Sequence, residues 1–332
     1  MKKIAPAAGK ALLFAALTWS AGTASYSLDF GALLSNDSAF VGNKMNELAL
    51  EQTDTASAWL RLPLGEKAYF ATEGLYRFER LPIDLFDVEE VPDEANDESA
   101  FDLSLAKVQA TVPAGKGICT LSAGRFGMVD ATSDIFNQNA DGLSAGYASP
   151  VINLSLYGAY TGLLNTRTVA MLNKANIAPE DTEKKYELAE KYAVAAATLS
   201  LPNFAGSQTA TLQALGTFRL EEESFNRLYA TLACNGPLHP RLYYTLSSTL
   251  ALRQYDGDRD LANLTKASLA LYTGAKSLAF TANAVYASGK QGPFKAFQGF
   301  CADCSRMLAY ACCIDDCVNR TDCGHVGTEI FL

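Results

Sequence analysis

The stretch at residues 141–162 constrains the fold more than any other part of the chain, because its apolar residues recur at every second position. Two such runs flank a short break at Ser149-Pro150. Each run is about 9–11 residues long, which suits a tilted strand that crosses a membrane. Alternation on both sides of a short turn is typical of a β-hairpin. One face is apolar and aromatic, and the other carries small uncharged polar groups, which predicts a narrow, wet interior.

The same alternation recurs along most of the chain and predicts about thirteen strands. The strands are expected at residues 26–34, 56–64, 68–79, 101–112 and 118–126, in the two arms of the hairpin, and at 193–201, 210–220, 228–232, 242–250, 261–272 and 278–286. Within 101–112 the phase slips by one residue at about Ala106, which indicates a β-bulge.

The expected connections alternate between short and long. Short turns are expected near Gly65, Gly115, Pro150, Pro202, Gly236 and Gly274, and longer loops near Asn36, Asp93, Asp134, Glu180, Glu222 and Gly257. Outer-membrane barrels join their strands by short periplasmic turns and longer outer loops, whereas Greek-key sandwiches mix loop lengths. The order therefore favours a barrel whose first strand rises from the periplasm.

The N-terminus predicts export. Lys2, Lys3 and Lys10 precede the apolar residues 11–17, and small residues follow up to Ala24, which is the pattern of a secretory signal peptide. Removing this segment lowers the formal charge from -9 to -12, because three lysines and no acids are lost. An acidic exported protein without a basic stripe is a poor candidate for binding nucleic acid.

Signal peptide, amphipathic strands of about ten residues and alternating connections together resemble bacterial outer-membrane β-barrel proteins of the porin type. Residues 124–147 also look like the strand–loop–strand units of that family. The resemblance covers roughly residues 26–300, and it implies passive passage of small hydrophilic solutes without a cofactor.

We predict an all-β, antiparallel up-and-down transmembrane β-barrel of about 14 strands (roughly 12–16), because a sheet can span lipid only if it closes. The expected division is a signal peptide at 1–24, the barrel at 25–300 and a Cys-rich tail at 301–332. The expected location is the bacterial outer membrane. The expected partners are its lipid and small hydrophilic solutes, with a homo-oligomer as an option.

Charged and amide residues on the polar faces of these strands are the candidates for lining a pore, where mixed charges would set ion preference. They are Arg61, Glu73, Arg77, Glu79, Gln213, Arg219, Arg227, Arg241 and Asn283. A short turn places the strands of Arg61, Glu73 and Arg77 side by side. The alternative is that such residues pair with one another and hydrate or plug the interior.

Two segments leave alternatives open. The acidic run at 84–98 is expected as a solvated loop, and its spacing does not match an EF-hand Ca²⁺ site. Six cysteines crowd the end of the chain from Cys301 to Cys323. They are compatible with disulfides, with a zinc site that includes Cys304 and His325, or with an altered reading frame.

Catalysis is not expected. The chain has two histidines; His239 is expected in a short turn, and no phosphate-binding loop, nucleophile elbow or HExxH metal motif is present. Two other functions remain as rivals: a closed surface barrel that binds a host through its long loops, and a soluble periplasmic β-protein.

Overall fold

The computed structural model describes residues 28–44, 47–84, 97–166, 186–221, 225–255, 258–273, 279–288 and 322–331. These residues form one sheet of fourteen strands in the order β1 to β14, in which each strand pairs antiparallel with its neighbours in sequence. The strands are β1 (Asp29–Lys44), β2 (Glu47–Pro63), β3 (Ala68–Asp84), β4 (Asp97–Ala114), β5 (Gly117–Val129), β6 (Asn137–Ala148), β7 (Asn153–Tyr160), β8 (Tyr192–Leu201), β9 (Thr209–Arg219), β10 (Phe225–His239), β11 (Leu242–Tyr255), β12 (Asp258–Tyr272), β13 (Ala279–Ser288) and β14 (Asp322–Phe331). The predicted all-β, up-and-down architecture is therefore confirmed.

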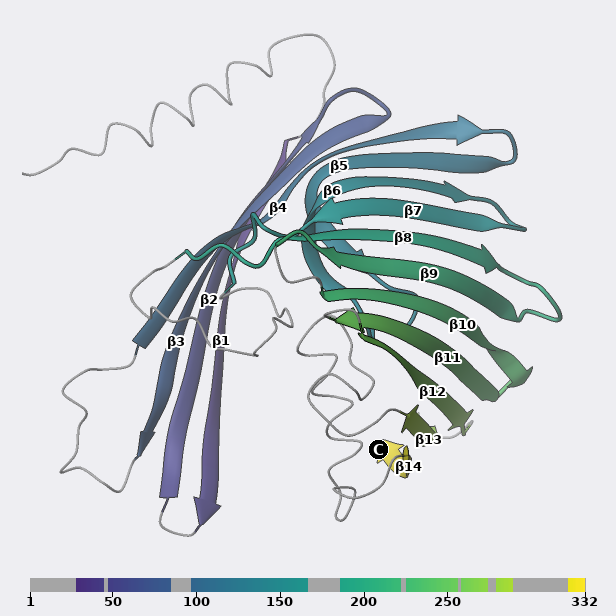
Figure 1. Ribbon diagram of the computed structural model, residues 1–332. Coiled ribbons are helices and arrows are strands. Elements are labelled where there is room, and N and C mark those ends of the chain that lie inside the picture. Colours follow the sequence, from purple (N-terminus) through teal and green to yellow (C-terminus); the bar gives the residue numbers. More distant parts are fainter. Residues whose placement is uncertain are drawn as a thin grey trace, which may run out of the picture.

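The strands do not all follow the same course. In Figure 1, β5 to β12 form a curved wall, whereas β1, β2 and β3 run at a steep angle to that wall on one side. Among the described strands, no ladder joins β1 to β14, so these two are the edges of the sheet. The described part of the chain contains no helix long and apolar enough to cross a membrane.

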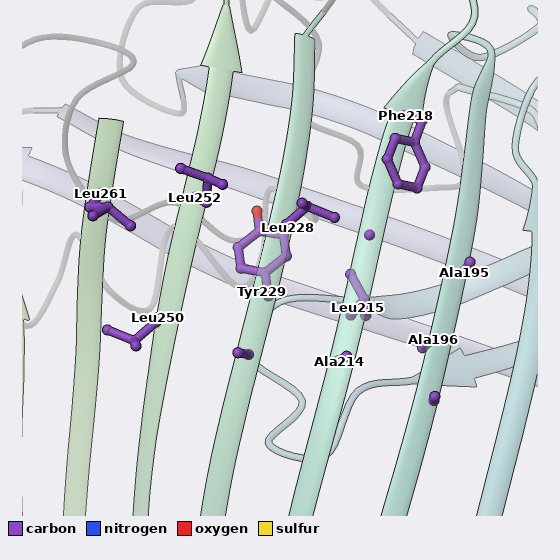
Figure 2. Close-up of a pocket in the computed structure, with 13 residues that line it drawn as sticks. Ala195, Ala196, Ala214, Leu215, Phe218, Leu228, Tyr229, Leu250, Leu252 and Leu261 are labelled. Carbon is purple, nitrogen blue, oxygen red and sulfur yellow. The ribbon is translucent and has the colours of Figure 1, made fainter. Parts of the chain in front are cut away.

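The outer face of the curved wall is apolar and exposed. On β10, Leu228 is 46% exposed, and on β11, Leu250 is 55% exposed. Figure 2 looks onto this face, where leucines and Phe218 surround a shallow groove of about 560 Å³ floored by small residues such as Ala214. A water-soluble sheet would turn these leucines inward, and so large an exposed apolar area marks a surface that meets lipid or protein.

The predicted β-bulge is present, two residues before the expected position. Glu73 on β3 pairs with Leu105 and Gly74 pairs with Leu103, which leaves Ser104 as the extra residue on β4. The Ser104 hydroxyl donates a hydrogen bond of 3.2 Å to the carbonyl oxygen of Glu73. The bulge restores the phase of β4, so that its polar positions face the same side as those of β3.

The predicted loop near Asn36 is wrong, because β1 continues as a strand to Lys44. The Asn36 amide donates a hydrogen bond of 2.5 Å to Asp54 on β2, and Gln52 donates one of 2.9 Å to the other oxygen of Asp54. These polar side chains resembled a loop in the sequence, but cross-strand bonds hold them in a ladder. The predicted longer loop near Gly257 lies outside the described residues, between the end of β11 at Tyr255 and the start of β12 at Asp258.

The predicted boundaries of the chain's three parts are only partly within the described residues. Residues 1–24 lie outside them, as do residues 85–96 of the acidic run and residues 289–321, which include most of the cysteines. Residues 322–331 belong to the expected tail, and they form β14 paired with β13. The sheet therefore extends beyond residue 300.

Replacing an outward-facing leucine with a cation tests which face meets lipid. We expect Leu250→Lys to lower the free energy of unfolding by about 2–4 kcal/mol, because the ammonium would lie in hydrocarbon. The measurement is equilibrium urea unfolding of the protein inserted in lipid vesicles.

The control is Thr245→Lys, which places the same group on the exposed interior face of the same strand. We expect it to change stability by less than about 0.5 kcal/mol. Equal losses for the two variants would contradict the assignment of faces.

Candidate functional site: a strap across the polar interior

The interior face of the curved wall carries hydroxyl and arginine side chains. On β10, Arg227 is 1% exposed, although the next residue is the exposed Leu228. The Thr231 and Thr249 hydroxyls bond across β10 and β11 at 2.9 Å. Arg227 also lies directly opposite Arg253, which is 2% exposed. Asp260 on β12 lies opposite Arg253 on its other side, so one carboxylate faces this pair of guanidinium groups.

Residues 130–136, which connect β5 to β6 and are called the strap below, turn into this interior. The Asp130 carboxylate organises the strap: one oxygen accepts from the backbone N–H groups of Ile135 and Phe136, at 2.9 and 2.8 Å. The other oxygen accepts from the backbone N–H and the hydroxyl of Thr132, at 2.9 and 2.7 Å. Hydrogen bonds within residues 130–136 therefore shape the turn of the strap.

The strap reaches strands far away in the sequence. The backbone N–H of Ala131 donates to Gln213 on β9 at 2.9 Å, and Gln213 in turn donates to Thr198 on β8 at 2.8 Å. The Lys266 ammonium on β12 donates to Asp134 at 2.6 Å. These contacts fix the strap against the β8–β12 side of the interior.

Apolar contacts seal the same side. Ile135 and Phe136 are fully buried, and the Phe136 ring lies 6.4 Å from the ring of Tyr157 on β7. They belong to one buried cluster with Phe126, Met128, Ala140, Tyr192, Val194, Ala196, Leu215, Tyr229, Ala251, Ala262 and Leu264. The strap therefore fills the interior next to β8–β12.

The strands on the other side keep charged groups at the same face. Register places Glu73, Arg77 and Lys107 of β3 and β4 on this face, and none of them is buried. Arg77 and Glu79 form an ion pair along β3. The Lys107 ammonium lies 6.0 Å from the Phe126 ring, which belongs to the buried cluster. The interior thus has a sealed half and a charged, accessible half.

A second network anchors the connection between β7 and β8. Arg125 donates twice to Asp141, at 2.9 and 2.8 Å, and once to Asp102 at 3.1 Å. It also donates to the carbonyl oxygens of Leu103 and Leu163, at 3.1 and 2.7 Å. All five N–H donors of the guanidinium are therefore used, which only arginine can do.

The nine predicted pore-lining residues do not form a single ring. Four of them, Arg61, Glu73, Arg77 and Glu79, lie on the β2–β3 part of the interior face, and two are buried, Gln213 against the strap and Arg227 on β10. Arg219 lies at the end of β9, where it pairs with Glu190 and Glu221. Asn283 shares a face of β13 with Val285, and Arg241 is exposed in a turn. The strands of Arg61, Glu73 and Arg77 do lie side by side, with Arg61 opposite Ala71, Glu73 opposite Trp59 and Arg77 opposite Thr55. Their role in a pore stays a prediction.

Arg241 lies in a turn rather than on a strand, because the turn before β11 comes later in the chain than predicted. The expected turn near Gly236 is wrong: β10 runs through Gly236 to His239, and the chain turns at residues 240–241. Gly236 has a φ of 155°, a conformation that favours glycine, and it remains in the ladder opposite Tyr244.

Of the residues that hold the strap, sequence analysis named Gln213 but missed Lys266. It also missed the buried Arg253, which could have been found because it continues the alternation of Ser247 and Thr249 on β11. The adjacent apolar pair Ile135-Phe136 in a polar loop was the available signal for a buried segment. No group of His, Cys, Asp and Glu among the described residues is arranged to hold a metal ion.

No known family model matches the chain, and no curated protein matches it. Among solved structures, it is similar to in-vitro folded OmpT, an outer membrane protein of Vibrio cholerae in trimer form, with 8% identity, a TM-score of 0.41, and coverage of 92% of this chain and 99% of that one. It is also similar to the anion-selective porin from Comamonas acidovorans, with 12% identity, a TM-score of 0.35, and coverage of 82% and 94%.

The Arg125 network can be tested by stability. We expect Arg125→Lys to lower the free energy of unfolding by about 2–4 kcal/mol. An ammonium cannot form the bidentate pair of hydrogen bonds to Asp141 and also reach Asp102 and Leu163. Urea unfolding from lipid vesicles measures the loss. Arg241→Lys, at an exposed turn, is the matched control and should leave stability unchanged within about 0.5 kcal/mol. A loss for Arg125→Lys no larger than that of the control would show that the network does not stabilise the fold.

Proposed function

We propose that this chain is an integral outer-membrane channel for passive diffusion of small hydrophilic solutes. The observation that carries the proposal is the inverted distribution of residues on β10 and β11: Leu228 and Leu250 are exposed, while Arg227 and Arg253 are buried. An apolar outer face and a polar inner face suit a sheet with lipid outside and water inside.

Insertion in lipid also requires the sheet to close. The unpaired backbone groups of β1 and β14 would each cost several kcal/mol in hydrocarbon. Both strands are end strands, and in an up-and-down order of even number they lie antiparallel. Pairing of β1 with β14 would therefore complete a barrel without changing any other ladder.

The solute path runs between the strap and β2–β4. The strap seals the β8–β12 side with Phe136 and its neighbours, whereas Glu73, Arg77 and Lys107 remain accessible on the opposite side. Hydrated ions and small polar solutes would pass along these charged side chains. The proposed transport is passive and has no catalytic step.

A closed surface barrel that binds a partner through its outer loops is the second candidate. The complete burial of Ile135 and Phe136 favours it, because a strap held in this position narrows the interior. The two candidates differ in one measurable property, which is conductance.

Single-channel recording in planar bilayers tests the proposal. We expect the wild-type protein to give discrete conductance steps, and the double variant D134N/K266Q to give larger ones, because the strap loses the ion pair that fixes it to β12. The charge-swapped variant D134K/K266D is the control, since it restores an ion pair of opposite direction and should return the conductance toward the wild-type value.

Different experimental results would exclude the two candidate functions. If the wild-type protein inserts, as judged by heat-modifiable gel mobility, but gives no steps, the channel proposal is wrong and the closed barrel replaces it. If the protein stays soluble without detergent, both membrane functions are wrong.

A further inference from the structure

A polar pocket of about 610 Å³ lies at the short-turn end of β2, β3 and β4, away from the strap. It is called the turn-side pocket here. Asp29, Arg61, Glu66, Lys67, Tyr69 and Gln109 contribute its polar side chains. The pocket lies on the interior face, because Arg61 and Tyr69 share that face with Gln109 across the β2–β3–β4 ladders. The proposed channel assigns no task to it.

Hydrogen bonds fix the direction of the Gln109 amide. Its oxygen accepts from the Tyr69 hydroxyl at 2.8 Å and from the Lys107 ammonium at 3.2 Å. An ammonium can only donate, so the amide oxygen must face Lys107. The amide nitrogen, with two N–H donors, therefore points away from Lys107 and remains available to a ligand in the pocket.

The Arg61 guanidinium is held by stacking. Its central carbon lies 3.9 Å from the centre of the Tyr69 ring. Stacking uses the flat face of the guanidinium and leaves the in-plane N–H groups free to bind an acceptor. Among the described residues, no carboxylate lies within ion-pair distance of Arg61, so no described carboxylate uses its forked donors.

The charged residues that line the pocket balance, because Arg61 and Lys67 are cationic and Asp29 and Glu66 are anionic. Asp29 lies opposite Arg61 in the β1–β2 register without an ion pair between them. The N–H donors of Arg61 and Gln109, rather than a surplus of charge, therefore favour a ligand with acceptor oxygens, and the Arg61 guanidinium favours one that carries a negative charge.

We propose that the turn-side pocket binds the oxyanion of a small solute, a carboxylate or a phosphate, through the forked donors of stacked Arg61 and the amide nitrogen of Gln109. The site would hold such a solute at the periplasmic mouth. This binding does not depend on conduction, so it can be present or absent whether or not the chain is a channel.

Isothermal titration calorimetry of the full-length protein in detergent tests the proposal. Inorganic phosphate and acetate are titrated separately at constant ionic strength, with chloride as the balancing anion. We expect saturable binding of at least one of the two. We expect Arg61→Gln to weaken it by at least about tenfold, since a charge-assisted forked contact is lost. Gln109→Glu keeps both acceptor contacts to Tyr69 and Lys107 but replaces the donor with an oxygen, and it should weaken binding to a similar extent.

Two further variants separate specific binding from bulk charge. Arg61→Lys keeps the charge and loses the fork, so it should also weaken binding. Arg241→Gln removes an exposed arginine from another turn at the same mouth, and it should leave binding unchanged within about twofold. Heat-modifiable mobility of every variant confirms that the sheet is folded.

Three results would overturn the proposal: no saturable binding of either anion to the wild-type protein, unchanged affinity in Arg61→Gln, or equal weakening by Arg241→Gln. None of them bears on whether the chain conducts.

Discussion

Pairing of the backbone is the constraint on which the rest of this structure depends. Each inner strand from β2 to β13 bonds to both of its neighbours, so the peptide groups of the wall need no water. Once these groups are paired within the sheet, the alternation of side chains along each strand determines which residues lie on each face, because successive side chains point to opposite sides. Leucines can then face outward in rows, and Arg227 and Thr231 can occupy the inside of the same strand.

The polar interior contains buried charges that must be compensated. Arg227 and Arg253 repel each other in facing register and lose hydration when they are buried, and Asp260 on β12 lies opposite Arg253. The strap brings two further carboxylates into the interior: Asp130 shapes the strap and Asp134 holds Lys266. The apolar residues of the strap meanwhile cover the wall. A single short connection thus supplies both a partner for Lys266 and apolar packing.

The alternation in the sequence predicted the strand order, because it is a local property that each strand carries for itself. Where polar residues occupy both faces, as in Ser35-Asn36-Asp37-Ser38, that signal vanishes, and the cross-strand bond from Asn36 to Asp54 identifies the strand. The contacts that position the strap cannot be predicted from local sequence, because Ala131 binds Gln213 and Asp134 binds Lys266 across 82 and 132 residues. The interior residues on β9 and β10 were found by phase, but whether each is accessible depends on the strap.

The unequal lengths of the two edge strands have a consequence for the rim. β1 has sixteen residues and β14 has ten. If they pair from the turn end, the last six residues of β1 have β2 on one side and no partner on the other, and this edge rises about 20 Å further, at about 3.3 Å per residue. An unpaired strand edge of this kind is a template for a strand of another chain. Asn36 and Asp37 lie just before this edge, among the last residues that β14 would cover, and polar groups there disfavour pairing with a second molecule.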